Sequence, residues 1–307
     1  MSASRGVSRR IKRYWVVYAL MLPALIAIAL FSYLPMAGIY MAFTNYKLGR
    51  GFQAVFSGQF IGLTHFSRLF SNVMFTRTLI NTIVINLLKL LFSFPAPIIF
   101  AVLVNEVRTR RYKRVIQTVS YLPSFLSSVV IYGLLMGLLS PSYGLINSLL
   151  NALGKETIHF LGVPRYFRTI LVSIDVWRYT GWEAIIYLAA ITSIDQEQYE
   201  AATIDGATRV QQVFFVTLPS LRDLIILMFI LRVGTIMSSD FEMIFQLLSP
   251  PLYSVGDVID TFVYRIGLIK AEFSFSTAVG VFKSLVGLAL ILITNRLAKH
   301  FGSTGIW

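Results

Sequence analysis

Six apolar runs dominate the sequence, and each is near the ~20 residues that an α-helix needs to cross a bilayer. The hydrocarbon core offers no water to backbone N–H and C=O groups, so only helices and closed barrels can span it. Composition agrees, because 56% of the 307 residues are hydrophobic and only 13% are charged, with a mean hydropathy of +0.71. We therefore predict an all-α integral membrane protein whose six transmembrane helices lie at 14–43, 78–104, 115–139, 170–194, 221–239 and 273–295.

Basic residues predict the orientation of these helices. Five of the 27 Lys and Arg residues stand in the first thirteen positions, and five more cluster at 108–114. Since basic loops stay in the cytoplasm, both termini and the loops at 106–114 and 195–220 should face that side. The net charge of +13 therefore does not indicate nucleic acid. The expected organisation is a cytoplasmic tail at 1–13, a six-span domain at 14–295 and a second cytoplasmic tail at 296–307.

Enzymatic chemistry finds no support in the residue pattern. His65, His159 and His300 are isolated, there is no cysteine, and no G-x-x-x-x-G-K-[ST] loop is present to hold phosphates. Asp175 and Glu183 lie eight residues apart, about 12 Å along one helix, which is too far for a carboxylate dyad. We expect a chain that is not an enzyme and binds no metal or cofactor itself.

The stretch 199–221 is the long polar-rich segment between the C-terminal apolar runs. It starts with good helix formers, and Gly206 should end that helix because glycine tolerates a left-handed backbone. Pro219 suits the first turn of the helix that follows. In between, an apolar stripe with helical spacing is formed by Val210, Val213, Phe214 and Leu218. Spacing alone leaves open an amphipathic connector that rests on the membrane surface.

As a motif, this stretch resembles the E-A-A loop of permeases from binding-protein-dependent ABC importers. The matching positions are Glu200, Ala201, Ala202, Asp205, Gly206, Ala207, Leu218 and Pro219. The resemblance implies a type I importer permease whose cytoplasmic coupling helix, within about 195–220, docks on an ATPase subunit. ATP and Mg would then be used by that partner and not by this chain.

Three loop segments resemble carbohydrate permeases more narrowly. They are F-I-G-L-T-H-F-S-R-L-F at 60–70, G-L-I-N-S-L-L-N-A-L-G at 144–154 and G-D-V-I-D-T-F-V-Y-R-I-G-L at 256–268. The pattern is closest to permeases for complex saccharides, including aldouronate and alginate. It implies a bacterial inner-membrane location, an oligosaccharide substrate, an extracytoplasmic solute-binding protein and two ATPase subunits. A second permease subunit is also implied; a related chain is favoured, and a second copy of this chain stays open.

Charged groups at membrane depth are the candidates for a substrate pathway, because burying them is costly and they usually face a cavity. Aromatic rings that can pack on sugar faces accompany them in the fourth span. The predicted pathway residues are Lys283, Glu183, Trp182, Asp175, Arg178 and Tyr187, with Lys89 and Arg232 as further candidates. Structural ion pairs are the alternative, and Asp175 could satisfy Arg178 at i and i+3. A secondary transporter or channel, using Glu183 and Asp175 as coupling carboxylates, also stays open.

Basic residues in the outward loops suggest an acidic saccharide. The first two of these loops, at 45–72 and 140–168, carry Lys47, Arg50, Arg68, Lys155, Arg165 and Arg168 against Glu156 as the one acid. Lys283 would also be an uncompensated charge within the last span unless something anionic meets it. Pairing of these cations with acids of the third outward loop is the competing explanation.

Overall fold

The computed structural model describes residues 13–46, 54–300, 302 and 305–306. These residues are helical almost throughout, apart from one short antiparallel pairing between β1 (Thr44–Asn45) and β2 (Gln59–Phe60). The chain divides into two compact units, one made of Met1–Leu69 with Ile266–Val281 and the other of Phe70–Arg265 with Phe282–Trp307.

The first unit begins with a long apolar helical stretch. Its elements are α2 (Trp15–Ile28), η1 (Ala29–Tyr33), η2 (Leu34–Phe43), β1, α3 (Ala54–Ser57), β2 and most of α4 (Thr64–Ser71). Contacts that join this N-terminal part to the 266–281 part include the Tyr46 amide, which donates to Ser274 Oγ at 2.9 Å, and Arg68, which pairs with Glu272 at 2.8 Å.

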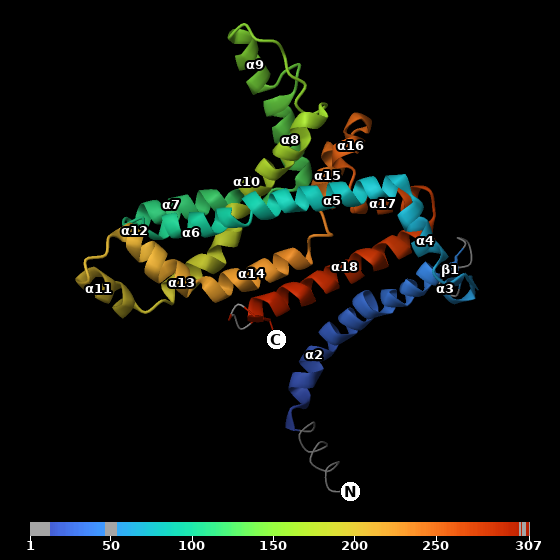
Figure 1. Ribbon diagram of the computed structural model, residues 1–307, viewed down its shortest axis with the longest axis horizontal. Coiled ribbons are helices and arrows are strands. Elements are labelled where there is room, and N and C mark those ends of the chain that lie inside the picture. Colours follow the sequence, from blue (N-terminus) through green and yellow to red (C-terminus); the bar gives the residue numbers. More distant parts are fainter. Residues whose placement is uncertain (1–12, 47–53, 301, 303–304, 307) are drawn as a thin grey trace. The chain divides into compact units, whose positions relative to one another are not determined.

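The second unit contains most of the helices. In chain order they are α5 (Val73–Phe92), α6 (Pro95–Asn105), α7 (Arg110–Tyr121), η3 (Leu122–Phe125), α8 (Ser128–Leu139), α9 (Leu145–Ala152), α10 (Pro164–Thr192), α11 (Gln196–Ile204), α12 (Arg209–Gln212), η4 (Val213–Thr217), α13 (Leu218–Ser220), α14 (Arg222–Gly234), α15 (Phe241–Leu247), η5 (Pro250–Leu252), α16 (Tyr253–Gly256) and α17 (Ile259–Val263). The elements η6 (Tyr264–Ile269) and α18 (Phe273–His300) each contribute residues to both units. α5 and α6 follow one another as one long rod, and α7 runs beside α6 (Figure 1).

The described helices reproduce the six predicted spans only in part, because at most five of them qualify by length and composition. Among the described residues, three helical stretches are long and apolar enough to cross a bilayer: Trp15–Phe43, Val73–Asn105 and Phe273–His300. Two bent pairs also qualify if each is one span: Arg110–Phe125 with Ser128–Leu139, and Arg209–Ser220 with Arg222–Gly234. α10 covers the predicted fourth span, and its 29 residues exceed the ~20 required, but it is not among the stretches that are apolar enough to qualify.

The predicted span at 115–139 is not one continuous helix, because α7 and α8 meet at a bend of 103°. Pro123 stands in the first turn of η3, and Leu126 then has an extended backbone with ψ 135°. Ser127 restarts the helix by accepting a hydrogen bond from the Val130 amide. The predicted outward loop at 140–168 also ends early, since Pro164 begins α10.

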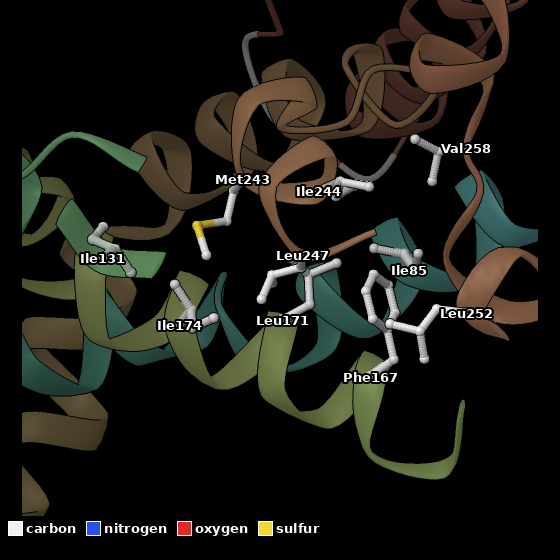
Figure 2. Close-up of a cluster of buried hydrophobic side chains, with 10 residues drawn as sticks. All are labelled: Ile85, Ile131, Phe167, Leu171, Ile174, Met243, Ile244, Leu247, Leu252 and Val258. Atoms are coloured by element: carbon white, nitrogen blue, oxygen red, sulfur yellow. The ribbon is translucent and has the colours of Figure 1, made fainter. Parts of the chain in front are cut away.

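An apolar core packs α5, α8, α10 and α15 together (Figure 2). α10 contributes Phe167, Leu171 and Ile174, whose spacing of four and three puts them on one helical face. The opposing surface is formed by Ile85, Ile131, Met243, Ile244, Leu247, Leu252 and Val258. Ile174 directly precedes Asp175 in the chain, so this core also fixes the position of a buried carboxylate.

Candidate functional site

The segment predicted to couple to an ATPase forms a short helical hairpin. Asp195 caps α11 by accepting a hydrogen bond from the Glu197 amide at 3.0 Å. Gly206 then has φ +79°, and the Ala207 amide returns to the Ala202 carbonyl at 2.9 Å. The prediction that Gly206 ends this helix is confirmed, because a residue with a Cβ is strained in that conformation.

Two hydrogen bonds between side chains hold the hairpin closed. Gln212 Nε2 donates to Thr203 Oγ1 at 2.8 Å, and the hydroxyls of Tyr199 and Thr217 lie 2.9 Å apart. These four residues were not singled out from the sequence, because the pairs are nine and eighteen positions apart and belong to no motif. The fold of the segment is therefore set by its own residues.

The surface of this hairpin carries the motif positions. Glu200, Ala201, Asp205, Gly206 and Pro219 are exposed, whereas Ala202, Ala207 and Leu218 are half-buried. The predicted apolar stripe does not act as one face: Val213 and Leu218 are half-buried, but Val210 and Phe214 are exposed. Polar and apolar groups of this hairpin are thus both available to a partner.

A polar cavity of about 240 Å³ lies among α5, α10, α14 and the start of α15. Its lining includes Asn86, Lys89, Asp175, Tyr179, Glu183, Arg232, Thr235, Ser238 and Asp240. Lys89 Nζ and Asp175 Oδ1 are 2.6 Å apart, and only 7% and 5% of these side chains are exposed. The Arg232 guanidinium joins Asp175 and Glu183, at 3.2 Å each.

The alternative in which Asp175 satisfies Arg178 is wrong. Asp175 faces α5 and α14, where Lys89 and Arg232 supply its counter-charges. Arg178 instead reaches the break between α7 and α8, donating to the Leu126 carbonyl at 2.8 Å and to Ser128 Oγ at 3.3 Å. It also pairs with Asp240, the capping residue of α15, at 3.6 Å.

Lys283 is not an uncompensated charge, which corrects the prediction from the sequence. Its Nζ pairs with Asp260, which also accepts a hydrogen bond from the Ser239 amide at 2.9 Å. Lys283 does not line the polar cavity. Within the outward loops, Arg68 pairs with Glu272, so at this position the ion-pair explanation holds. Lys47 and Arg50 lie outside the described residues.

The two aromatic residues of the predicted pathway, Trp182 and Tyr187, have different surroundings. Trp182 is half exposed and packs edge-on against Phe125, with ring centroids 5.6 Å apart. Tyr187 is 3% exposed and belongs to an apolar cluster with Ala184 and Leu188. Both border a second cavity of about 650 Å³. Glu183 and Arg232 line this cavity as well as the first one.

Known proteins resemble this chain over most of its length. Residues 93–303 match the family described as "Binding-protein-dependent transport system inner membrane component". The polygalacturonan/rhamnogalacturonan transport system permease protein YteP of Bacillus subtilis (strain 168) is 43% identical over 291 residues, covering 95% of this chain and 90% of YteP. Protein LplB of the same organism is 40% identical over 309 residues, covering 100% and 96%.

Solved structures agree with these relatives. A chain of a bacterial alginate ABC transporter, crystallised with an alginate pentasaccharide-bound periplasmic protein, superposes with a TM-score of 0.88 at 39% identity, over 97% of this chain and 99% of that one. A second structure, of a transporter "involved in the import of the acidic polysaccharide alginate", gives 0.87 at 38% identity. The chain therefore belongs to the family of binding-protein-dependent transport system inner membrane components, as a multi-pass permease subunit of an ABC importer and not an enzyme.

Proposed function

We propose that this permease carries oligosaccharides, and acidic ones in preference to neutral ones. The observation that supports this best is the shared chemistry of its relatives, since polygalacturonan and alginate are both polymers of uronic acids. Both relatives cover nearly the whole chain, so the aligned region includes the residues around the polar cavity.

The cavity itself limits how a carboxylate can be recognised. Its lining has two basic residues, Lys89 and Arg232, against the acids Asp175, Glu183 and Asp240. It offers no surplus of positive charge, so a uronate would have to compete for a cation that is already paired. Arg232 is the candidate, because 30% of its side chain is exposed and it borders both cavities.

The partners proposed from the motif complete the transporter. They are a second permease subunit, an extracytoplasmic solute-binding protein and two ATPase subunits that use ATP and Mg on the cytoplasmic side. The α11–α13 hairpin would dock on one ATPase through the surface around Glu200, so that closure of the ATPases rocks the helices that follow. The hairpin leads directly into α14, which carries Arg232.

A secondary transporter would need a deep carboxylate that is free to couple an ion. Asp175 and Glu183 are the two candidates, and both are engaged by cations in this structure. This observation favours the ATP-driven alternative.

ATPase stimulation tests the proposed cargo. The intact transporter is reconstituted with its binding protein, and the ATPase rate is measured with uronate oligosaccharides and with neutral oligosaccharides of matched length. We expect the acidic ligands to stimulate at concentrations at least tenfold lower. Equal stimulation by both classes would reduce the proposal to a general saccharide importer.

A further inference from the structure

A groove lies between α7 and α10, and it shares no lining residue with the polar cavity. It has a volume of about 580 Å³, and its walls include Val115, Val119, Pro123, Val176 and Trp177. The three side chains Val115, Val119 and Trp177 are 58%, 64% and 49% exposed. The groove is thus apolar and open along one side.

The floor of the groove is closed by backbone contact between the two helices. A Cβ added at Gly181 of α10 would stand 2.1 Å from the Ser120 carbonyl oxygen of α7. The two backbones therefore touch at this point, and the groove is a fixed feature of the packing.

Cations gather at the end of the groove where α7 begins. Arg108, Arg110, Arg111 and Arg114 are all exposed, and the first turn of α7 contains no acidic residue. Glu106, the nearest acid in the chain, pairs with Arg209 at 3.9 Å. Within the described part of the chain no ion pair joins any of these four arginines to an acid, so their charge is available to an external anion.

The helical register shows which arginine lies on the face of α7 that lines the groove. Arg111 stands four residues before Val115 and eight before Val119, so the three share one face of α7. At ~100° per residue, Arg110 lies about 140° around the helix axis from the middle of that face and about 100° from Arg111. From Arg111 to Pro123 the helix rises about 18 Å, close to one leaflet of the ~30 Å hydrocarbon core plus the start of its headgroups.

We propose that this groove holds one anionic phospholipid. An acyl chain lies against Val115, Val119 and Trp177, and the lipid phosphate is bound by the Arg111 guanidinium, with Arg108 beside the start of the helix. A planar guanidinium matches the paired oxygens of a phosphate. A protein helix in the same groove would bury Val119 and Trp177 equally well, but it would not by itself neutralise the exposed arginines.

Fluorescence quenching by brominated lipids tests the site, because Trp177 is part of the groove wall. The intact transporter is placed in nanodiscs that contain either brominated phosphatidylglycerol or brominated phosphatidylcholine. The fluorescence of Trp177 is obtained as the difference between the fluorescence of the unaltered chain and that of its Trp177→Phe variant. We expect the anionic lipid to reach half-maximal quenching at a mole fraction about fivefold lower, the preference that one arginine near a membrane surface provides.

Two substitutions in the same helix separate headgroup binding from general charge. Arg111→Gln should abolish the preference for the anionic lipid, whereas Arg110→Gln, with the same loss of charge on the opposite face, should retain it. Equal quenching by both lipids in the unaltered chain would overturn the assignment of the headgroup. Absence of quenching by either would show that protein covers the groove, and would overturn the site altogether.

Discussion

Asp175 is 5% exposed and lies between two cations from different helices, Lys89 of α5 and Arg232 of α14. The desolvation of such a group is offset only while its counter-charges remain in place. The three positions are 86 and 57 residues apart along the chain. Their meeting is therefore a consequence of helix packing, and no local signal in the sequence could have paired them.

Removing both members of the buried pair should destabilise the protein by less than the sum of the two single removals. Lys89→Met alone leaves Asp175 with Arg232 as its sole counter-charge, and Asp175→Asn alone leaves Lys89 buried without its acid. We expect each to lower the free energy of unfolding by about 3–5 kcal/mol, and the double variant to lower it by clearly less than the sum. The measurement is thermal unfolding of the purified protein.

Lys283→Met provides the matched control for this cycle, because the Lys283–Asp260 pair is about one-fifth exposed. Its effect should be smaller than that of Lys89→Met. Strict additivity of the Lys89 and Asp175 variants would contradict the assignment of a coupled buried pair.

At the scale of elements, the α11–α13 hairpin depends on one left-handed residue. In Gly206→Leu a side chain must adopt φ +79°, which costs about 1–2 kcal/mol and favours another path for the loop. We expect the variant to remain in the membrane but to lose ATPase association and transport, as measured by copurification and uptake. Gly206→Asn, which tolerates the left-handed region, should keep most of both activities; full transport by Gly206→Leu would contradict this role.

A second element, the break between α7 and α8, depends on Arg178. The guanidinium spans the Leu126 carbonyl and Asp240, and a single ammonium cannot reach both. Arg178→Lys should therefore lower the unfolding free energy by about 1–3 kcal/mol, the cost of a lost hydrogen bond to a half-buried group. Thermal unfolding measures this change, and unaltered stability would show that the bend is held by Pro123 and Ser127 alone.

Local chemistry explains which elements were predictable. The helix end at Gly206 and the helical turn at Pro219 each follow from a residue type whose backbone preference acts within a few positions. The 103° bend was missed, although Pro123 stood inside the predicted span, because membrane helices often tolerate proline. The partners of Arg178 depend on how α10 packs against the break between α7 and α8. The hydrophobic periodicity of the sequence does not contain that information.

For the whole molecule, orientation in the membrane is the property that charge predicts and that labelling can test. The chain has no cysteine, so a single introduced thiol has no background. Lys155 and Arg111 are both exposed, and the basic-loop argument puts them on opposite sides of the membrane. In intact cells, Lys155→Cys should react with an impermeant maleimide and Arg111→Cys should not until the cells are opened; labelling of position 111 from outside would reverse the orientation.

The central claim is that this permease moves an oligosaccharide with energy taken from ATP by another subunit and transmitted through the α11–α13 hairpin. Accumulation of a labelled uronate oligosaccharide in proteoliposomes, supplied with binding protein on the substrate side and ATP on the other, tests it most directly. We predict accumulation that requires ATP, persists when proton and sodium gradients are collapsed, and is lost in Glu200→Ala although that protein inserts normally. Accumulation driven by an ion gradient in the absence of ATP would contradict the account.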